Sequence, residues 1–308
     1  MLRSTSETTT RLPDLMLVGA AKSGTTSIAH QFTRHPRVFL PMNKKEPHFF
    51  SFNEEPPPYT DKAFVRTLVW KLKDYVALYV SAPPNARIAD CSTSYLYRHH
   101  TAVPHILRTY GSRAVELNMS AILRDPVERA YSHWLYLVRN GHEDLSFEEA
   151  IAPATVERRK KERWGFDYLG YGLYAEAVGN FTSAFPSFKV YLLEDLKDLQ
   201  GTFDDICDRA GLEHFEVEKV QSNPGGIPKS RWLVRTIRRN PIVRSFSHML
   251  PSGMRNSVRA KRDGMLKQAL DRPEMPRAAR DILNAYYRAD VERLSATIGR
   301  DLGHWCSK

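Results

Sequence analysis

The chain alternates between short apolar runs and amphipathic segments along most of its length. Continuously apolar runs such as residues 15–18 are expected of strands buried on both faces of a sheet. The predicted strands are residues 15–18, 38–40, 87–90, 114–123 and 189–193. The predicted helices are residues 25–34, 61–73, 104–110, 172–185, 202–210 and 275–298. Because strands and helices alternate, the pattern predicts one three-layer α/β domain with a central, mostly parallel β-sheet flanked by helices.

The first strand runs into a turn rich in glycine and serine, LMLVGAAKSGTTS at residues 15–27. Gly19 and Gly24 bracket this turn, in which backbone N–H groups can converge on an anion, and Thr25 opens a helix whose N-terminal end favours negative charge. The glycines have the spacing of the nucleotide-binding P-loop, G-x-x-x-x-G-K-[ST], but Thr25 stands where that motif has lysine. The loop lysine is Lys22 instead. A P-loop kinase is therefore an alternative that the position of Lys22 opposes.

A second motif, LRDPVERAYSHW at residues 123–134, joins the end of a predicted strand to a helix. Arg124 emerges at the carboxyl end of the strand, Asp125 can cap the helix, and Pro126 suits its first turn. The helix then carries Ser132. A guanidinium fork and a hydroxyl are suitable partners for a phosphate monoester, and an Arg–Asp pair on an ordinary capped helix is the alternative.

A third motif, NKKEPHFFSF at residues 43–52, places charged side chains beside phenylalanines and predicts a pocket wall. Glu46 precedes Pro47, which biases Glu46 towards an extended conformation. Since alternate side chains of an extended segment share a face, Glu46 and His48 are expected to point the same way.

The formal net charge is +10, and one segment carries the equivalent of the whole excess. Residues 221–262 contain ten Lys and Arg and no Asp or Glu. Such a segment can attract an anionic substrate, a nucleic acid or an acidic membrane surface, and a solvated helical face is the plain alternative. A basic nucleic-acid or membrane-surface binder is thus a further hypothesis. We expect residues 221–275 to form a basic helical lid or a wall on the acceptor side.

The N-terminal residues and the mean hydropathy indicate where in the cell the protein is expected. Residues 1–13 are rich in Ser and Thr without an apolar core, so they are predicted to be a disordered leader rather than a secretory signal. The mean hydropathy of −0.46 argues against a membrane span. A cytoplasmic enzyme is expected.

Taken in order along residues 15–305, these motifs and the block GLYAEAVGNFTSAFPSFKVYLLEDL resemble the sulfotransferases that use 3′-phosphoadenylyl sulfate (PAPS). NKKEPHFF is similar to the segment of the glycan-modifying, heparan-sulfate-type enzymes, and the ending IGRDLGHW to that of bacterial members. The resemblance implies a sulfotransferase domain at residues 14–305. It also implies PAPS as donor, adenosine 3′,5′-bisphosphate as product, no metal, and a hydroxyl of a glycan, lipid or secondary metabolite as acceptor.

The resemblance also assigns roles by position. Glu46 would be the general base, Lys22 would bind the oxygen that bridges phosphate and sulfur, and His48 would orient the acceptor or Glu46. Lys44 and Lys45 are both candidate electrostatic helpers. The implied donor-binding residues are Lys22, Ser23, Gly24, Thr25 and Thr26 for the 5′-phosphosulfate, with Arg124 and Ser132 for the 3′-phosphate.

Two departures from the family pattern affect these roles. The late R-K-G or K-G-R loop that completes the 3′-phosphate site in relatives does not occur here, and residues 223–231 or 258–262 are its candidate replacements, with Lys229 and Arg231 as candidate ligands. Residues 91–97 lack the histidine that cytosolic members use as base, which favours Glu46. No nucleic-acid partner is expected, peripheral membrane contact through residues 229–262 is possible, and the oligomeric state is not predicted.

Overall fold

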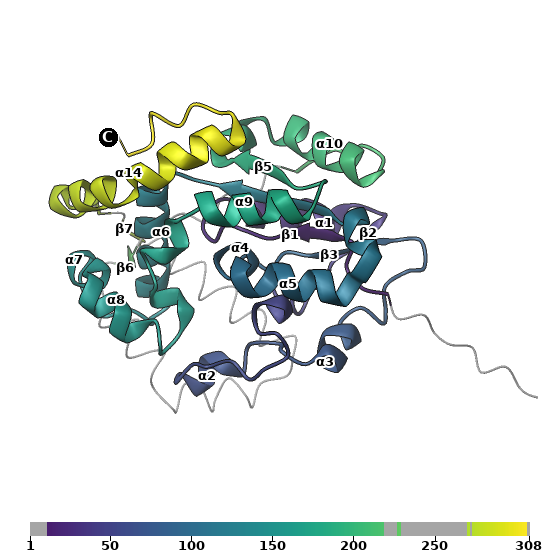
Figure 1. The fold of residues 1–308 in the computed structure, drawn as a ribbon, viewed down its shortest axis with the longest axis horizontal. Coiled ribbons are helices and arrows are strands. Elements are labelled where there is room, and N and C mark those ends of the chain that lie inside the picture. The colour runs from purple at the N-terminus through teal and green to yellow at the C-terminus, as the bar shows by residue number, and fades with distance from the viewer. Residues whose placement is uncertain (1–10, 219–226, 229–269, 272, 307–308) are drawn as a thin grey trace, which may run out of the picture.

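The computed structural model describes residues 11–218, 227–228, 270–271 and 273–306. Its centre is a five-stranded sheet in the order β2-β3-β1-β4-β5, in which each paired strand is parallel to its neighbour (Figure 1). The strands are β1 (Leu15–Leu17), β2 (Val38–Phe39), β3 (Arg87–Asp90), β4 (Asn118–Leu123) and β5 (Lys189–Leu192). The predicted α/β class with a parallel central sheet is confirmed.

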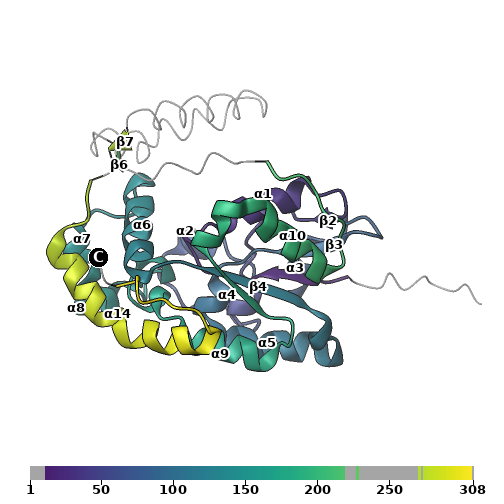
Figure 2. The ribbon, with the colours of Figure 1, turned by 90° about the horizontal axis from the view of Figure 1, so that it is seen from above.

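Helices cover both faces of this sheet, so the domain has three layers (Figure 2). Leu15 and Leu17 of β1 pack in the cluster that contains residues of α1 and α10, whereas Met16 and Val18 pack in the cluster formed with α5 and α9. Alternate side chains of a strand point to opposite faces, so burial on both sides explains why this stretch is continuously apolar.

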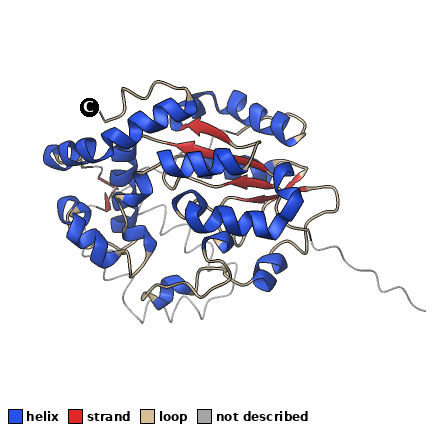
Figure 3. Ribbon diagram, viewed as in Figure 1, coloured by secondary structure: helices blue, strands red, loops and turns tan. Residues whose placement is uncertain are grey.

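The helices differ in length, and several are joined by single turns of 3₁₀-helix; Figure 3 shows how they surround the strands. The α-helices are α1 (Thr25–Arg34), α2 (Lys62–Val65), α3 (Leu72–Ala77), α4 (Ser94–Tyr97), α5 (His99–Tyr110), α6 (Pro126–Arg139), α7 (Phe147–Ile151), α8 (Pro153–Arg159), α9 (Ala175–Ala184), α10 (Leu199–Ala210) and α14 (Arg277–Ile298).

The prediction of one helix over residues 61–73 was wrong, because a tertiary hydrogen bond interrupts it. Asp61 caps the short helix α2 by accepting from the Phe64 N–H at 3.0 Å. The chain then leaves the helix, and the Val69 N–H donates to the Pro47 carbonyl at 3.0 Å. Helical periodicity in the sequence could not show this competing partner.

The starts of one helix and one strand differ from the prediction for local reasons. The helix predicted from Pro104 begins at His99, since the N–H groups of Thr101 and Ala102 close its first turn onto the Arg98 carbonyl at 2.9 and 2.8 Å. The strand predicted over residues 114–123 begins only at Asn118, because residues 111–116 form a 3₁₀-helix.

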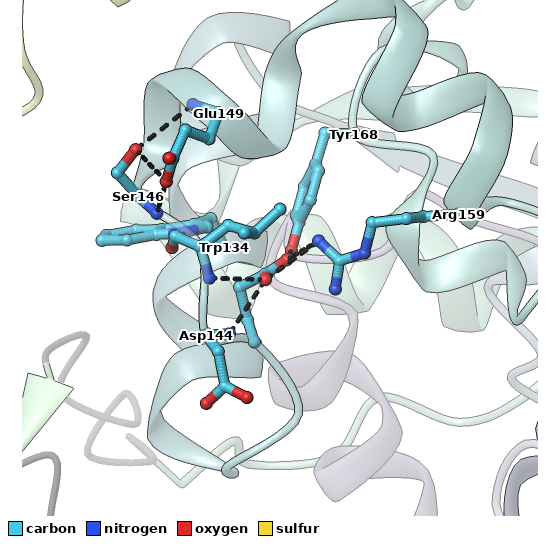
Figure 4. Close-up of polar contacts among 8 residues, drawn as sticks. Trp134, Asp144, Ser146, Glu149, Arg159 and Tyr168 are labelled. Carbon is cyan, nitrogen blue, oxygen red and sulfur yellow. Dashed lines mark hydrogen bonds and ion pairs between the residues drawn. The ribbon is translucent and has the colours of Figure 1, made fainter.

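A buried carboxylate holds the loops beyond α6 together. Glu143 is 3 % exposed and accepts from Arg159 Nη1 at 2.9 and 2.8 Å and from the Tyr168 hydroxyl at 2.7 Å. The backbone N–H groups of Asp144 and Leu145 also donate to it, at 2.9 and 3.0 Å. Figure 4 shows Arg159 and Tyr168 converging here. This cluster fixes the path of the chain between α8 and residue 168.

Parts of the predicted leader and basic segment lie outside the described residues. Within the leader, the Arg11 side chain donates to the Pro83 carbonyl at 2.7 Å. Of residues 221–275, the strands β6 (Ile227–Pro228) and β7 (Leu270–Asp271) pair antiparallel, and the Tyr131 hydroxyl donates to the Pro273 carbonyl at 2.8 Å. The predicted basic lid, Lys229 and Arg231 are among the residues that are not described. Across the described ranges, a helix able to cross a bilayer is not found.

Candidate active site

A cavity of about 620 Å³ opens at the carboxyl end of the sheet. Its wall is built from the segments that follow β1, β3, β4 and β5, together with residues of the 46–48 segment and α6. The connection after β1 leads to β2 on one side of the sheet and the connection after β4 leads to β5 on the other, so the direction of the strand order changes between β1 and β4. In open α/β sheets such a switch point is where ligands bind.

The cavity brings together most of the site residues that the sequence predicts. Lys22, Gly24, Thr25, Thr26, Glu46, His48, Arg124 and Ser132 all line it. Among the described donor-binding candidates, Ser23 does not line the cavity, and neither do the two candidate helpers Lys44 and Lys45. For Ser23 the reason is local. Its side chain is fully buried behind the loop, and its N–H donates to the Ala20 carbonyl at 3.3 Å, which makes it part of the turn that shapes the cradle.

The loop after β1 depends on two residues with left-handed backbone. Lys22 has φ 72° and Gly24 has φ 90°. A Cβ on Gly24 would lie 2.7 Å from Leu196 Cδ1, so a larger residue would clash as well as strain the backbone. Gly24 precedes α1, whose first turn carries no acidic side chain. The N-terminal end of α1 therefore presents uncompensated positive potential to the cavity.

The ammonium group of Lys22 is largely buried and lies near other cations. Its Nζ lies 4.3 Å from the centroid of the Tyr136 ring. Burial, followed by repulsion from Arg139 and Arg124, lowers the pKa of Lys22 to about 8. An anion in the cavity would relieve both the desolvation and the repulsion.

Glu46 is held by two neighbours, one on each carboxylate oxygen. Thr93 Oγ1 donates to Oε2 at 2.8 Å, and Lys45 Nζ lies 3.1 Å from Oε1. Burial raises the pKa of Glu46, but Lys45, His48 and the hydrogen bond from Thr93 outweigh it and leave the pKa below its ordinary value. Glu46 is thus ionised at neutral pH. Lys44 instead donates to the Thr67 carbonyl, which separates the two lysines that the sequence left equivalent.

His48 is fixed through both its backbone and its ring. Its N–H donates to Ser92 Oγ at 2.9 Å, its Nδ1 lies 2.8 Å from Ser94 Oγ, and its ring packs edge-on against Trp164 with centroids 4.9 Å apart. The backbone at His48 is left-handed with φ 66°, yet Glu46 and His48 share the cavity as predicted. Burial lowers the pKa of His48 to about 4, so the ring is neutral at pH 7.

A buried carboxylate fixes the polar turn that follows β3. Asp90, at the end of β3, accepts from the Ser92 N–H at 2.9 Å and from Ser92 Oγ at 2.6 Å. Its other oxygen accepts from the hydroxyls of Tyr75 and Tyr95 at 2.8 and 2.7 Å. With its own proton directed to Asp90, Ser92 Oγ presents a lone pair to the His48 N–H. The polar turn after β3 therefore fixes the position of the segment that carries Glu46 and His48.

Arg124 and Ser132 reach the cavity from the β4–α6 junction, as the sequence predicts. Asp125 caps α6 by accepting from the Val127 N–H at 2.9 Å. Arg124 Nη1 donates to the Lys22 carbonyl at 3.4 Å, and its Nη2 lies 3.5 Å from Glu128 Oε2. The guanidinium thus links the anion-binding loop to the helix that carries Ser132.

Other lining residues were not singled out from the sequence. These are Phe64, Thr93, His133, Tyr136, Arg163, Trp164 and Tyr171. Thr93 lies in the polar turn after a strand, which is a signal that could have found it. Arg163 and Trp164 lie in a charged connection with no motif. An ion pair of Arg163 with Asp61 at 3.6 Å and the packing of Trp164 against Phe52 place them here.

Comparison with known proteins finds similar proteins both by sequence and by structure. No family model matches the chain. The membrane-associated sulfotransferase kil1 of Dictyostelium discoideum is 26% identical over 146 residues, which are 46% of this chain and 27% of that relative. The match thus covers well under two thirds of the relative's length. The crystal structure of a sulfotransferase from Alicyclobacillus acidocaldarius is similar with a TM-score of 0.72 and 25% identity, covering 96% of this chain and 99% of that chain.

Proposed function

We propose that this protein is a sulfotransferase, as its similarity to two sulfotransferases supports, and that it transfers a sulfuryl group from PAPS to a hydroxyl of an acceptor. The observation that carries the proposal is the placement of an ionised carboxylate, Glu46, and a loop cation, Lys22, on the wall of one cavity. Sulfuryl transfer needs a base for the acceptor proton and a cation for the leaving group, and these two residues supply them.

The residues present suit a donor with two phosphate groups. The left-handed Gly24, the N-terminal end of α1 and Lys22 form a cradle for one anionic group. Arg124 and Ser132 line the same cavity and suit a second phosphate. The donor supplies an activated sulfuryl group bonded to a phosphate oxygen.

The protein's part in the reaction follows from these positions. Glu46 accepts the proton of the acceptor hydroxyl as its oxygen bonds to sulfur, and Lys22 stabilises the negative charge on the phosphate oxygen as its bond to sulfur breaks. A positioned general base contributes about 10²–10⁴-fold, and a preorganised cation about 10²–10³-fold. His48, neutral and held by Ser94, orients the acceptor or Glu46. The scheme assigns no step to a metal.

The acceptor side is lined by aromatic rings and one cation. His48, Phe64, Arg163 and Trp164 form this wall. Trp164 also stacks on Phe52, with centroids 5.5 Å apart and planes 11° apart, which keeps its ring in place. Such a wall suits a sugar or another ring-bearing hydroxyl compound. The basic lid, peripheral membrane contact and cytoplasmic location remain predictions about residues or properties beyond the described structure.

Donor binding and turnover can be tested separately. We expect adenosine 3′,5′-bisphosphate to bind in a calorimeter without magnesium, whereas ATP with magnesium should not compete. Labelled PAPS and a panel of hydroxylated glycans, lipids and small metabolites should reveal transfer. Glu46→Gln should lower turnover by at least about 10²-fold while donor binding stays nearly intact, and Lys22→Ala should impair both. Failure of the bisphosphate to bind would refute the proposal.

A further inference from the structure

We infer that His99, His100 and Glu176 form a binding site for a divalent transition-metal ion of the Zn²⁺ class, outside the candidate active site. One ligand atom of each residue lies within 4.8 Å of the other two. His99 and His100 open α5, and Glu176 lies in the first turn of α9, which packs beside α5 on the same face of the sheet (Figure 1). None of the three lines the cavity that holds Glu46 and Lys22.

The separations are close to those of an occupied site. His100 Nε2 lies 3.4 Å from Glu176 Oε1, whereas the two imidazole rings lie against each other, with centroids 3.9 Å apart, and would have to separate around an ion. Zinc binds imidazole nitrogen and carboxylate oxygen at about 2.0–2.2 Å, so ligand atoms around a tetrahedral ion are roughly 3.3 Å apart. Small rotations of the exposed His100 and Glu176 side chains would bring all three atoms to this spacing.

The surroundings of His99 provide a second observation. Its Nδ1 lies 2.8 Å from the Asn180 side-chain amide, and Asn180 is one helical turn after Glu176 on α9. Metal-bound histidines almost always direct their other ring nitrogen to such an outer partner. Asn180 Nδ2 faces Nδ1 in this rotamer, and a flip of the amide turns its oxygen towards Nδ1–H, which leaves the Nε2 lone pair for the ion.

The exposure of two of the side chains also suits a metal. His100 and Glu176 side chains are 69% and 70% exposed, which leaves room for water as a fourth ligand. Two imidazoles and one carboxylate are a ligand set that zinc accepts.

Sequence spacing could not show this site, because Glu176 is distant in the chain and comes from another helix. An ion here would join α5 to α9. Since α5 follows α4, at whose start Thr93 and Ser94 contact Glu46 and His48, the link would stabilise the helix next to α4. A ligand that binds only the folded state raises its stability in proportion to the logarithm of its concentration.

The test is metal binding by the untagged full-length protein. Zn²⁺ should bind with a stoichiometry of one in a calorimeter, and Co²⁺ should give the visible absorption of a low-coordinate N/O site. Zn²⁺ should also raise the unfolding temperature. His100→Ala and Glu176→Gln should each weaken binding by at least about tenfold and reduce this thermal shift.

His304→Ala is the matched control, because His304 Nε2 lies 3.6 Å from Glu194 Oε1 in a pair that does not belong to the three-ligand cluster. It should leave Zn²⁺ binding unchanged. Metal-free unfolding temperatures of the variants show whether each one folds, as expected for exposed positions. Absence of Zn²⁺ binding, or binding that His100→Ala and Glu176→Gln leave unaltered, would overturn the inference whether or not the protein transfers sulfate.

Discussion

Thr93 Oγ1 donates a hydrogen bond to Glu46 Oε2 across 2.8 Å. This contact joins the turn after β3 to the segment that precedes Pro47, two parts of the chain that the sequence keeps well apart. It fixes one carboxylate oxygen of Glu46, while Lys45 lies against the other. The orientation and ionisation of the proposed base therefore depend on neighbours from both segments.

Thr93→Val should slow turnover by about tenfold with little change in donor affinity. Valine keeps the shape of threonine and removes only the hydroxyl, so Glu46 loses a hydrogen bond to its charged form and its pKa rises. The acid limb of the pH–rate profile should move to higher pH, measured with an acceptor identified by the hydroxyl panel. Thr109→Val is the control, since Thr109 Oγ1 donates to the His105 carbonyl within α5. An unchanged acid limb would contradict a role for Thr93.

Lys45→Met should shift the same acid limb to higher pH, because Lys45 is the largest of the influences that lower the pKa of Glu46 against the effect of burial. The sign follows from the charge: Glu46 is active when ionised, and removing a cation beside it favours the protonated form. Lys44→Met provides the comparison, since Lys44 donates to the Thr67 carbonyl instead. Equal shifts for the two variants would refute the distinction between them.

Lys22→Met should stabilise the folded protein at pH 7 while it impairs donor binding. Burial and neighbouring arginines hold the pKa of Lys22 at about 8 in the folded state, below its value of 10.5 in the unfolded chain. Between these values the unfolded state binds more protons, so the penalty is fully present below pH 8 and disappears as the pH rises towards 10.5. The gain in free energy of unfolding should be on the order of 1–3 kcal/mol. Urea unfolding at pH 7 and pH 10 should show the difference between variant and wild type shrinking; a constant difference would oppose this account.

Glu143→Gln should lower the free energy of unfolding by about 3–5 kcal/mol, because it leaves Arg159 in a buried site without its carboxylate. None of the described partners of Glu143 lines the cavity, so the KM values for donor and acceptor should change much less than the stability. Urea unfolding and the KM values for donor and acceptor are the measurements. Glu149→Gln, in the exposed capping box with Ser146 (Figure 4), should change both little. A Glu143→Gln variant as stable as the control would show that the buried pair contributes nothing net.

The sequence by itself determined the features that depend on neighbours along the chain. The apolar run at residues 15–18, the span of α1 at Thr25–Arg34 and the cap of α6 by Asp125 follow from periodicity and capping preferences, and the structure has them. Parallel strands end at one edge of a sheet, so the residues after β1 and β4 could also be placed together.

Only the tertiary structure decided which groups meet across long separations in the chain. Residues 61–73 contain a helical pattern, but the Pro47 carbonyl captures the Val69 N–H and divides it. Lys45 rather than Lys44 contacts Glu46. Arg163 pairs with Asp61 and Trp164 stacks on Phe52, contacts that no sequence motif encodes. Periodicity records which face of an element is buried. The partner on that face, and the electrostatic environment of each charged group, depend on packing between elements.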